Sequence, residues 1–257
     1  MKTRDLFKFK PSRELAAVLL HYLLITAVFY VSFQVVTVQR VAAQFLTFGV
    51  LGVMALGILA PAAYSTLALK RPMSAIGITK DRLLLSIGLG AAFAVAQYFM
   101  TLNKLALPGF RALFPLALMA VSVGFFENVF FRGFAQTRLE ESFGIVPGIV
   151  LSALLYCFYH VGYGMAGAEY LTLFVVGLVY SAVFRLTGSI FILFPLLTPM
   201  GAMYTNIREG LALPFEAGYG FALVIAFSVI GLVVIRRIRM KQTAGTARPA
   251  KVRVAGA

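Results

Sequence analysis

Residues 112–131 read ALFPLALMAVSVGFFENVFF, an apolar run of 20 residues between Arg111 and Arg132. An α-helix rises about 1.5 Å per residue, so about 20 such residues cross the roughly 30 Å hydrocarbon core of a bilayer. Glu127 is the only charged residue in the run. The stretch therefore predicts a transmembrane helix that carries one acid.

Further apolar runs of similar length lie on both sides of this one. Of the 257 residues, 61% are hydrophobic and 12% are charged, whereas about 25% charge is usual for a soluble domain. We therefore expect an all-α polytopic membrane protein with about eight transmembrane helices, in which residues 1–257 form a single transmembrane domain. Only Thr187 and Gly188 separate the sixth and seventh runs, which predicts a tight helical hairpin. The other runs are 15–38, 43–67, 83–102, 145–162, 170–186, 188–206 and 218–235.

The basic residues are distributed unevenly between the predicted loops. If the N-terminus is cytoplasmic, 19 of the 23 Lys and Arg residues face the cytoplasm and 4 face the other side. This asymmetry follows the positive-inside rule. It predicts an integral protein of a prokaryotic cell membrane, with the N- and C-termini in the cytoplasm. Residues 237–257 are expected to form a basic cytoplasmic tail that contacts anionic lipid rather than nucleic acid.

Glu127 is the acid that the predicted loops do not explain. The chain has nine Asp and Glu residues, and the other eight fall in polar flanks or predicted loops. A carboxylate at the bilayer centre costs about 2.5–3.5 kcal/mol or more, so such acids usually serve a function. The alternative is that Glu127 lies near the cytoplasmic boundary and pairs with Arg132. These two residues are five apart and align poorly on an α-helix, whereas Asn128 and Arg132 share a face.

His160 is one of only two histidines, and it ends the run SALLYCFYH at residues 152–160. The predicted span boundaries place Glu127 about one turn from the cytoplasmic end of its helix and His160 near the outer end of the next. These two side chains come together only if the fifth helix begins later than predicted or if the site is a water-filled cavity.

Several short motifs in this part of the chain resemble one known family. The matching residues run from Glu127 to Phe134 (ENVFFRGF), from Arg138 to Gly144 (RLEESFG), from Ser152 to His160, and over Gly177-Leu178 and Thr187-Gly188-Ser189. In order and spacing they are similar to the CPBP intramembrane proteases, also called the ABI or CAAX-protease-like family. The resemblance covers a protease-like core at about residues 112–206.

The resemblance implies an intramembrane endopeptidase of the glutamic type. It gives Glu127 the role of activating the attacking water, His160 that of helping to stabilise the oxyanion, and Arg132 that of organising the site. Hydrolysis of an amide needs a base for water and a donor for the developing oxyanion. The implied substrate is a membrane-associated protein or peptide within the lipid bilayer, and no nucleic acid.

Three positions depart from the family's pattern. Asn128 stands where the family has a second glutamate, and Tyr156 stands where it has a phenylalanine. The pattern also expects a histidine after Thr187-Gly188-Ser189, and the stretch that follows contains none. Thr198 or Asn206 would have to supply a hydrogen bond there. Zinc catalysis usually takes three protein ligands, and we expect no bound metal and no cofactor.

Two other functions stay open at this point. A catalytically silent relative would bind or protect a membrane partner, because a family core can persist after its chemistry is lost. A small proton-coupled transporter would use Glu127 to bind a proton or a cation. Transporters often carry inverted repeats, and the sequence shows no internal repeat.

Overall fold

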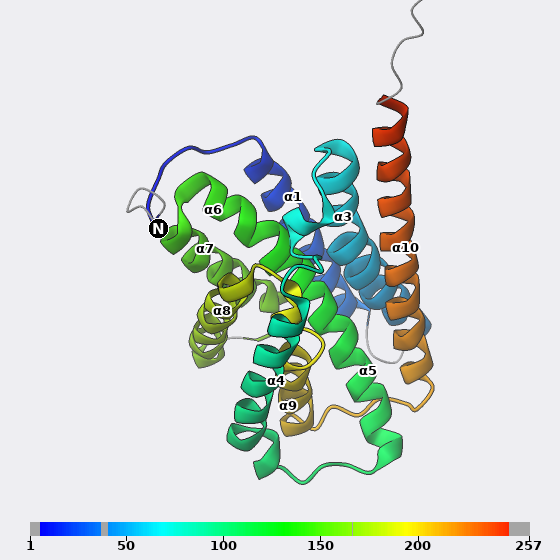
Figure 1. The fold of residues 1–257 in the computed structure, drawn as a ribbon. Helices are drawn as coiled ribbons and strands as arrows, with labels where there is room; N and C mark the ends of the chain where they lie inside the picture. Colours follow the sequence, from blue (N-terminus) through cyan, green and yellow to red (C-terminus); the bar gives the residue numbers. More distant parts are fainter. Residues whose placement is uncertain (1–5, 37–40, 166, 247–257) are drawn as a thin grey trace, which may run out of the picture.

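The computed structural model describes residues 6–36, 41–165 and 167–246, and this part of the chain is helical with no strand (Figure 1). The charge asymmetry between the loops counts some basic residues that lie outside the described residues. These are Arg40 and the basic residues within 1–5 and 247–257. The elements are α1 (Glu14–Tyr30), η2 (Val31–Val35), α2 (Val41–Gln44), η3 (Phe45–Leu59), α3 (Ala60–Ala63), η4 (Tyr64–Ala68), η5 (Met73–Ile76), α4 (Leu83–Met100), η6 (Leu102–Lys104), α5 (Phe110–Glu127), η7 (Asn128–Gln136), α6 (Thr137–Phe143), α7 (Ile145–Phe158), η8 (Tyr159–Tyr163), α8 (Ala168–Thr187), η9 (Ile190–Ile192), α9 (Leu197–Arg208) and α10 (Ala217–Thr246).

Several of these elements join end to end into longer helices. Within the described residues, seven helices are long and apolar enough to cross a bilayer. The predicted all-α membrane protein is therefore confirmed, and the expected number of about eight spans is close. The seven are Glu14–Val35, Ala42–Ala68, Leu83–Lys104, Phe110–Phe143, Ile145–Tyr163, Ala168–Thr187 and Ala217–Thr243.

The predicted run 188–206 is not among these seven helices. Helix α8 ends at Gly188, whose φ of 68° is left-handed, and Pro195 has no N–H to donate to a helix. A regular helix resumes only at Leu197 and lasts 12 residues, or about 18 Å. The predicted tight hairpin between the sixth and seventh runs is therefore wrong, because an irregular stretch separates α8 from α9.

The segment after α8 nevertheless returns the chain to the opposite end of the bundle. Asn128 contacts Thr198, and Gly124 lies against Pro199, so α9 runs antiparallel to α5. Helix α10 then runs back alongside α5, and the beginning of α1 lies at the same end of the bundle as the end of α10 (Figure 1). The stretch before α9 and α9 itself thus take the position of the eighth predicted span in the bundle, although α9 is not a full-length transmembrane helix.

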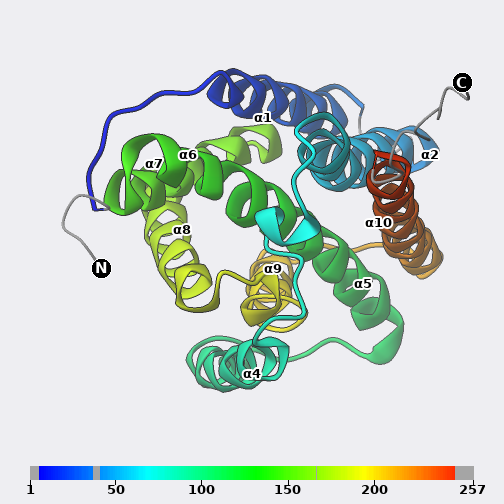
Figure 2. The same ribbon diagram turned by 45° about the horizontal axis from the view of Figure 1, so that its top comes forward.

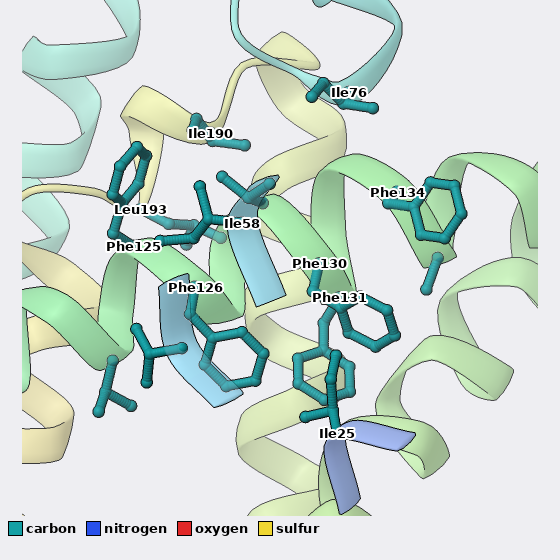
Figure 3. Close-up of a cluster of buried hydrophobic side chains, with 14 of the residues drawn as sticks. Ile25, Ile58, Ile76, Phe125, Phe126, Phe130, Phe131, Phe134, Ile190 and Leu193 are labelled. Atoms are coloured by element: carbon teal, nitrogen blue, oxygen red, sulfur yellow. The ribbon is translucent and has the colours of Figure 1, made fainter. Parts of the chain in front are cut away.

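The continuous helix Phe110–Phe143 lies at the centre of the bundle (Figure 2). Its most apolar window is 72% buried, whereas no other spanning helix exceeds 44%. Four fully buried phenylalanines of this helix pack with isoleucines from α1, η3, η5 and η9 (Figure 3). They are Phe126, Phe130, Phe131 and Phe134. The apolar core of the bundle therefore surrounds the same helix that carries Glu127.

Ion pairs join the charged residues at one end of the bundle. Glu14 lies 2.6 Å from Arg71 and 3.0 Å from Arg138, and Glu141 contacts the same two arginines at 2.9 and 3.0 Å. These contacts connect the start of α1, the loop before η5 and α6. Arg138 is only 1% exposed, so its guanidinium is stabilised by these carboxylates rather than by water.

We expect Gly133→Ala to destabilise the fold, because a Cβ at Gly133 would lie 2.1 Å from the backbone oxygen of Ile76. Forcing an extra carbon into a packed core costs about 1–3 kcal/mol, which would appear as a lower melting temperature of the detergent-solubilised protein. Gly88→Ala on α4 is the matched control, because nothing lies within 4 Å of its Cβ position. Equal melting temperatures for the two variants would contradict the close packing of the central helix on η5.

Candidate active site

The turn at Gly144 brings Glu127 and His160 to the same depth in the bundle. The central helix continues to Phe143 and α7 begins at Ile145, so the two helices form an antiparallel hairpin. Glu127 lies 17 residues before Gly144, and His160 lies 16 residues after it. The predicted difference in depth between them disappears because the central helix runs 12 residues beyond the predicted end at residue 131. Glu127 consequently lies near the middle of its helix.

Glu127 is a buried carboxyl whose side-chain partner is a tyrosine. The side chain is 5% exposed, and the hydroxyl of Tyr159 donates a hydrogen bond to its Oε1 atom. No ion pair reaches Glu127 from any residue that the structure describes. Tyr159 was not predicted as a site residue, because an aromatic residue in an apolar run usually belongs to the core.

Arg132 is directed at two serines rather than at Glu127. Its Nη1 atom donates to the hydroxyls of Ser152 at 3.1 Å and Ser181 at 2.6 Å, and its guanidinium carbon lies 4.9 Å from the centre of the Tyr156 ring. Residues 128–136 form a π-helix, in which hydrogen bonds join residues five apart. The wider turn brings Arg132 nearer to the face of Glu127 than an α-helix would. Arg132 thus links the central helix to α7 and α8.

The surroundings of His160 fix which ring nitrogen remains free. Its Nδ1 atom lies 2.8 Å from the carbonyl oxygen of Tyr156. A carbonyl only accepts hydrogen bonds, so Nδ1 carries a proton and Nε2 is left for another partner. The ring packs against Tyr159 and Tyr156 at centroid distances of 4.1 and 5.1 Å. The two tyrosines therefore hold the imidazole in one orientation.

Asn128 and Thr198 contact each other at the start of α9. The Asn128 amide donates to the backbone oxygen of Gly124 at 2.6 Å and to the Thr198 hydroxyl at 3.1 Å. Both amide protons are used, whereas the hydroxyl proton of Thr198 stays available to another acceptor. Asn206 lies eight residues further along α9, or about 12 Å away, and the side-chain hydrogen bond of Glu127 in the described part of the chain goes to Tyr159 instead.

These side chains provide the elements that amide hydrolysis requires. Glu127 can act as a base for water, the hydroxyl of Thr198 can donate to a substrate carbonyl, and the free nitrogen of His160 can accept a hydrogen bond from water. Among the residues described, no group of three or more His, Cys, Asp and Glu side chains is arranged to hold a metal ion.

Comparison with known families gives a match over the segment that contains this site. Residues 109–198 match the family model described as type II CAAX prenyl endopeptidase Rce1-like. The match supports a similarity of this segment to the CAAX-protease-like family. The CAAX-protease-like segment runs from just before α5 to the start of α9, and it contains every predicted site residue except Asn206. No curated protein and no solved structure matches the chain.

We expect Arg132→Lys to lower the melting temperature, because a lysine ammonium lacks the rigid fork with which a guanidinium holds two partners. Losing a hydrogen bond between a buried charge and Ser152 or Ser181 costs about 1–3 kcal/mol. Arg185→Lys is the matched control, because Arg185 is about half exposed and pairs with Glu140 at 3.2 Å. A melting temperature of Arg132→Lys equal to that of the control would show that the two serine contacts do not stabilise the fold.

Proposed function

We propose that this protein is an intramembrane endopeptidase that hydrolyses a peptide bond of a membrane-associated protein or peptide, with Glu127 as the base. The observation that carries the proposal is the hairpin that brings Glu127 and His160 to one depth inside a CAAX-protease-like segment. The proposal also takes support from the low exposure of both side chains, 5% and 6%, because electrostatic interactions are stronger away from water.

In the proposed reaction Glu127 removes a proton from water as the water oxygen attacks the scissile carbonyl carbon. The carbonyl oxygen becomes an oxyanion, which hydrogen-bond donors stabilise. As the carbon–nitrogen bond breaks, the proton held by Glu127 passes to the leaving amine. One water is consumed, and a carboxylic acid and an amine are released.

Two groups are proposed as partners of the reacting carbonyl. His160 can donate from Nε2 only when the ring carries both protons, because Nδ1 already donates to Tyr156. In its neutral form Nε2 accepts, and it then helps to orient the water. The Thr198 hydroxyl accepts a hydrogen bond from Asn128, which leaves its own proton free to donate to the oxyanion.

We expect Glu127→Gln to abolish peptide cleavage, because the amide of glutamine cannot take a proton from water. The loss of a general base costs about 10²–10⁴-fold in rate. The measurement uses protein in liposomes with fluorogenic peptides, both prenylated and unprenylated, that carry a C-terminal membrane anchor. Glu216→Gln is the matched control, because Glu216 is exposed in the segment before α10. This variant should cleave at the wild-type rate.

A second candidate function is that of a catalytically silent relative that binds a membrane partner. The absence of a histidine after Gly188 favours it. Cleavage that survives in Glu127→Gln would exclude the proposed mechanism. If the wild type cleaves none of the peptides and a membrane protein co-purifies equally with wild type and Glu127→Gln, the silent relative is the correct function.

We also propose that the end of the bundle with the ion pairs of Arg71, Arg138 and Arg185 faces the cytoplasm. Arg208 and Lys104 lie at the other end, where α9 and η6 terminate (Figure 1). The greater number of basic residues at the first end supports this orientation through the positive-inside rule. It places the N-terminus of α1 and the C-terminus of α10 in the cytoplasm.

For this orientation we expect a fluorescent protein fused after the C-terminus to be fluorescent in a bacterial host. Alkaline phosphatase fused at the same point should be inactive, because that enzyme is active only when it is exported. The same two reporters fused within the loop between α9 and α10 should give the opposite result. An active phosphatase at the C-terminus would reverse the proposed orientation.

A further inference from the structure

We propose that Tyr159 is a positioning residue that orients the carboxylate of Glu127 for attack by water. The inference rests on the proposed peptidase function. Its basis is the hydrogen bond that the Tyr159 hydroxyl donates to Glu127 Oε1. A carboxylate has two oxygens, and Oε1 is the one held by a side chain in the described part of the chain. The second oxygen is therefore left to take the proton from water.

The ring of Tyr159 is held firmly enough to fix a carboxylate. The residue is 1% exposed, and its ring centroid lies 4.7 Å from that of Phe131 and 5.8 Å from that of Phe126. Phe29 of α1 packs on the same ring at 6.0 Å. A rotamer locked by packing on several sides holds a site to the accuracy that catalysis needs. The phenylalanines thus position the hydroxyl, and the hydroxyl positions the acid.

The backbone places Tyr159 and His160 side by side on the same short element. Helix α7 ends at Phe158, and the 3₁₀-helix η8 begins at Tyr159. Gly162 lets this element pack closely, because a Cβ there would lie 2.8 Å from Cβ of Phe29. One rigid segment therefore carries both the residue that orients Glu127 and the histidine proposed to contact the substrate.

Arg132 does not provide this orientation. Its hydrogen bonds go to Ser152 and Ser181, so the guanidinium contributes charge near the site without fixing the rotation of the carboxylate. A simpler role for the Tyr159 hydroxyl is to satisfy a buried acid, as most buried polar groups are satisfied. The two roles differ in kinetics, because a positioning residue alters kcat even when the fold and substrate binding are unchanged.

The test compares Tyr159→Phe with wild type, Glu127→Gln and Tyr64→Phe. Tyr64 is the matched control, because it is a partly buried tyrosine that packs against Phe134. We expect Tyr159→Phe to lower kcat by about 10- to 100-fold, as expected for the loss of a hydrogen bond to a charged group, with KM unchanged. Tyr64→Phe should keep the wild-type kcat.

The outcomes separate this inference from the proposed function. If wild type cleaves, Glu127→Gln does not, and Tyr159→Phe keeps the wild-type kcat, then the inference alone is overturned. If wild type cleaves no peptide, the proposed function fails and the inference fails with it. Should Tyr159→Phe not fold, 3,5-difluorotyrosine at position 159 keeps the ring and hydroxyl but alters the donor strength. A changed kcat with unchanged KM supports positioning, and an unchanged kcat overturns it.

Discussion

The arrangement of the helices depends on the cost of leaving a polar group unpaired in an apolar interior. The central helix carries three such groups within six residues: a carboxyl, an amide and a guanidinium. The partner of each comes from a different part of the bundle, so no single neighbouring helix can satisfy them all. The pairs are Glu127 with Tyr159 of η8, Asn128 with Thr198 of α9, and Arg132 with Ser152 of α7 and Ser181 of α8.

These hydrogen bonds specify which helices lie next to each other, which apolar packing alone does not. Lipid tails are as apolar as the leucines and phenylalanines on the helices, so hydrophobic transfer gives little preference for one helix contact over another. The phenylalanines around Phe131 fill the core (Figure 3), but the polar pairs determine which helix lies beside which face. Glu127, the proposed base, is therefore also one of the groups that specify the fold around the site.

The apolar runs predicted the spans well, because hydropathy reports directly on transfer from water to lipid. The predicted depth of Glu127, about one turn from the cytoplasmic end of its helix, is wrong, because the apolar run ends at Arg132 whereas the helix continues to Phe143. Arg132 is 2% exposed and Arg138 is 1% exposed; serines of α7 and α8 accept hydrogen bonds from Arg132, and Glu14 of α1 pairs with Arg138. Hydropathy counts residues in order along the chain, so it has no information about such partners. Tyr159 was missed for the same reason, because its role depends on a contact 32 residues away.

Two of the three departures from the family's pattern are related in the structure. Asn128 replaces an acid, and Thr198 lies in the stretch where a histidine is expected, and the two side chains contact each other at 3.1 Å. A buried amide needs an acceptor for its N–H groups, because an unpaired one is costly, and the Thr198 hydroxyl is such an acceptor. An amide and a hydroxyl remain complementary and carry no charge. The two departures therefore form one neutral hydrogen-bonded pair next to Glu127, and in the proposed reaction proton transfer falls to Glu127 alone.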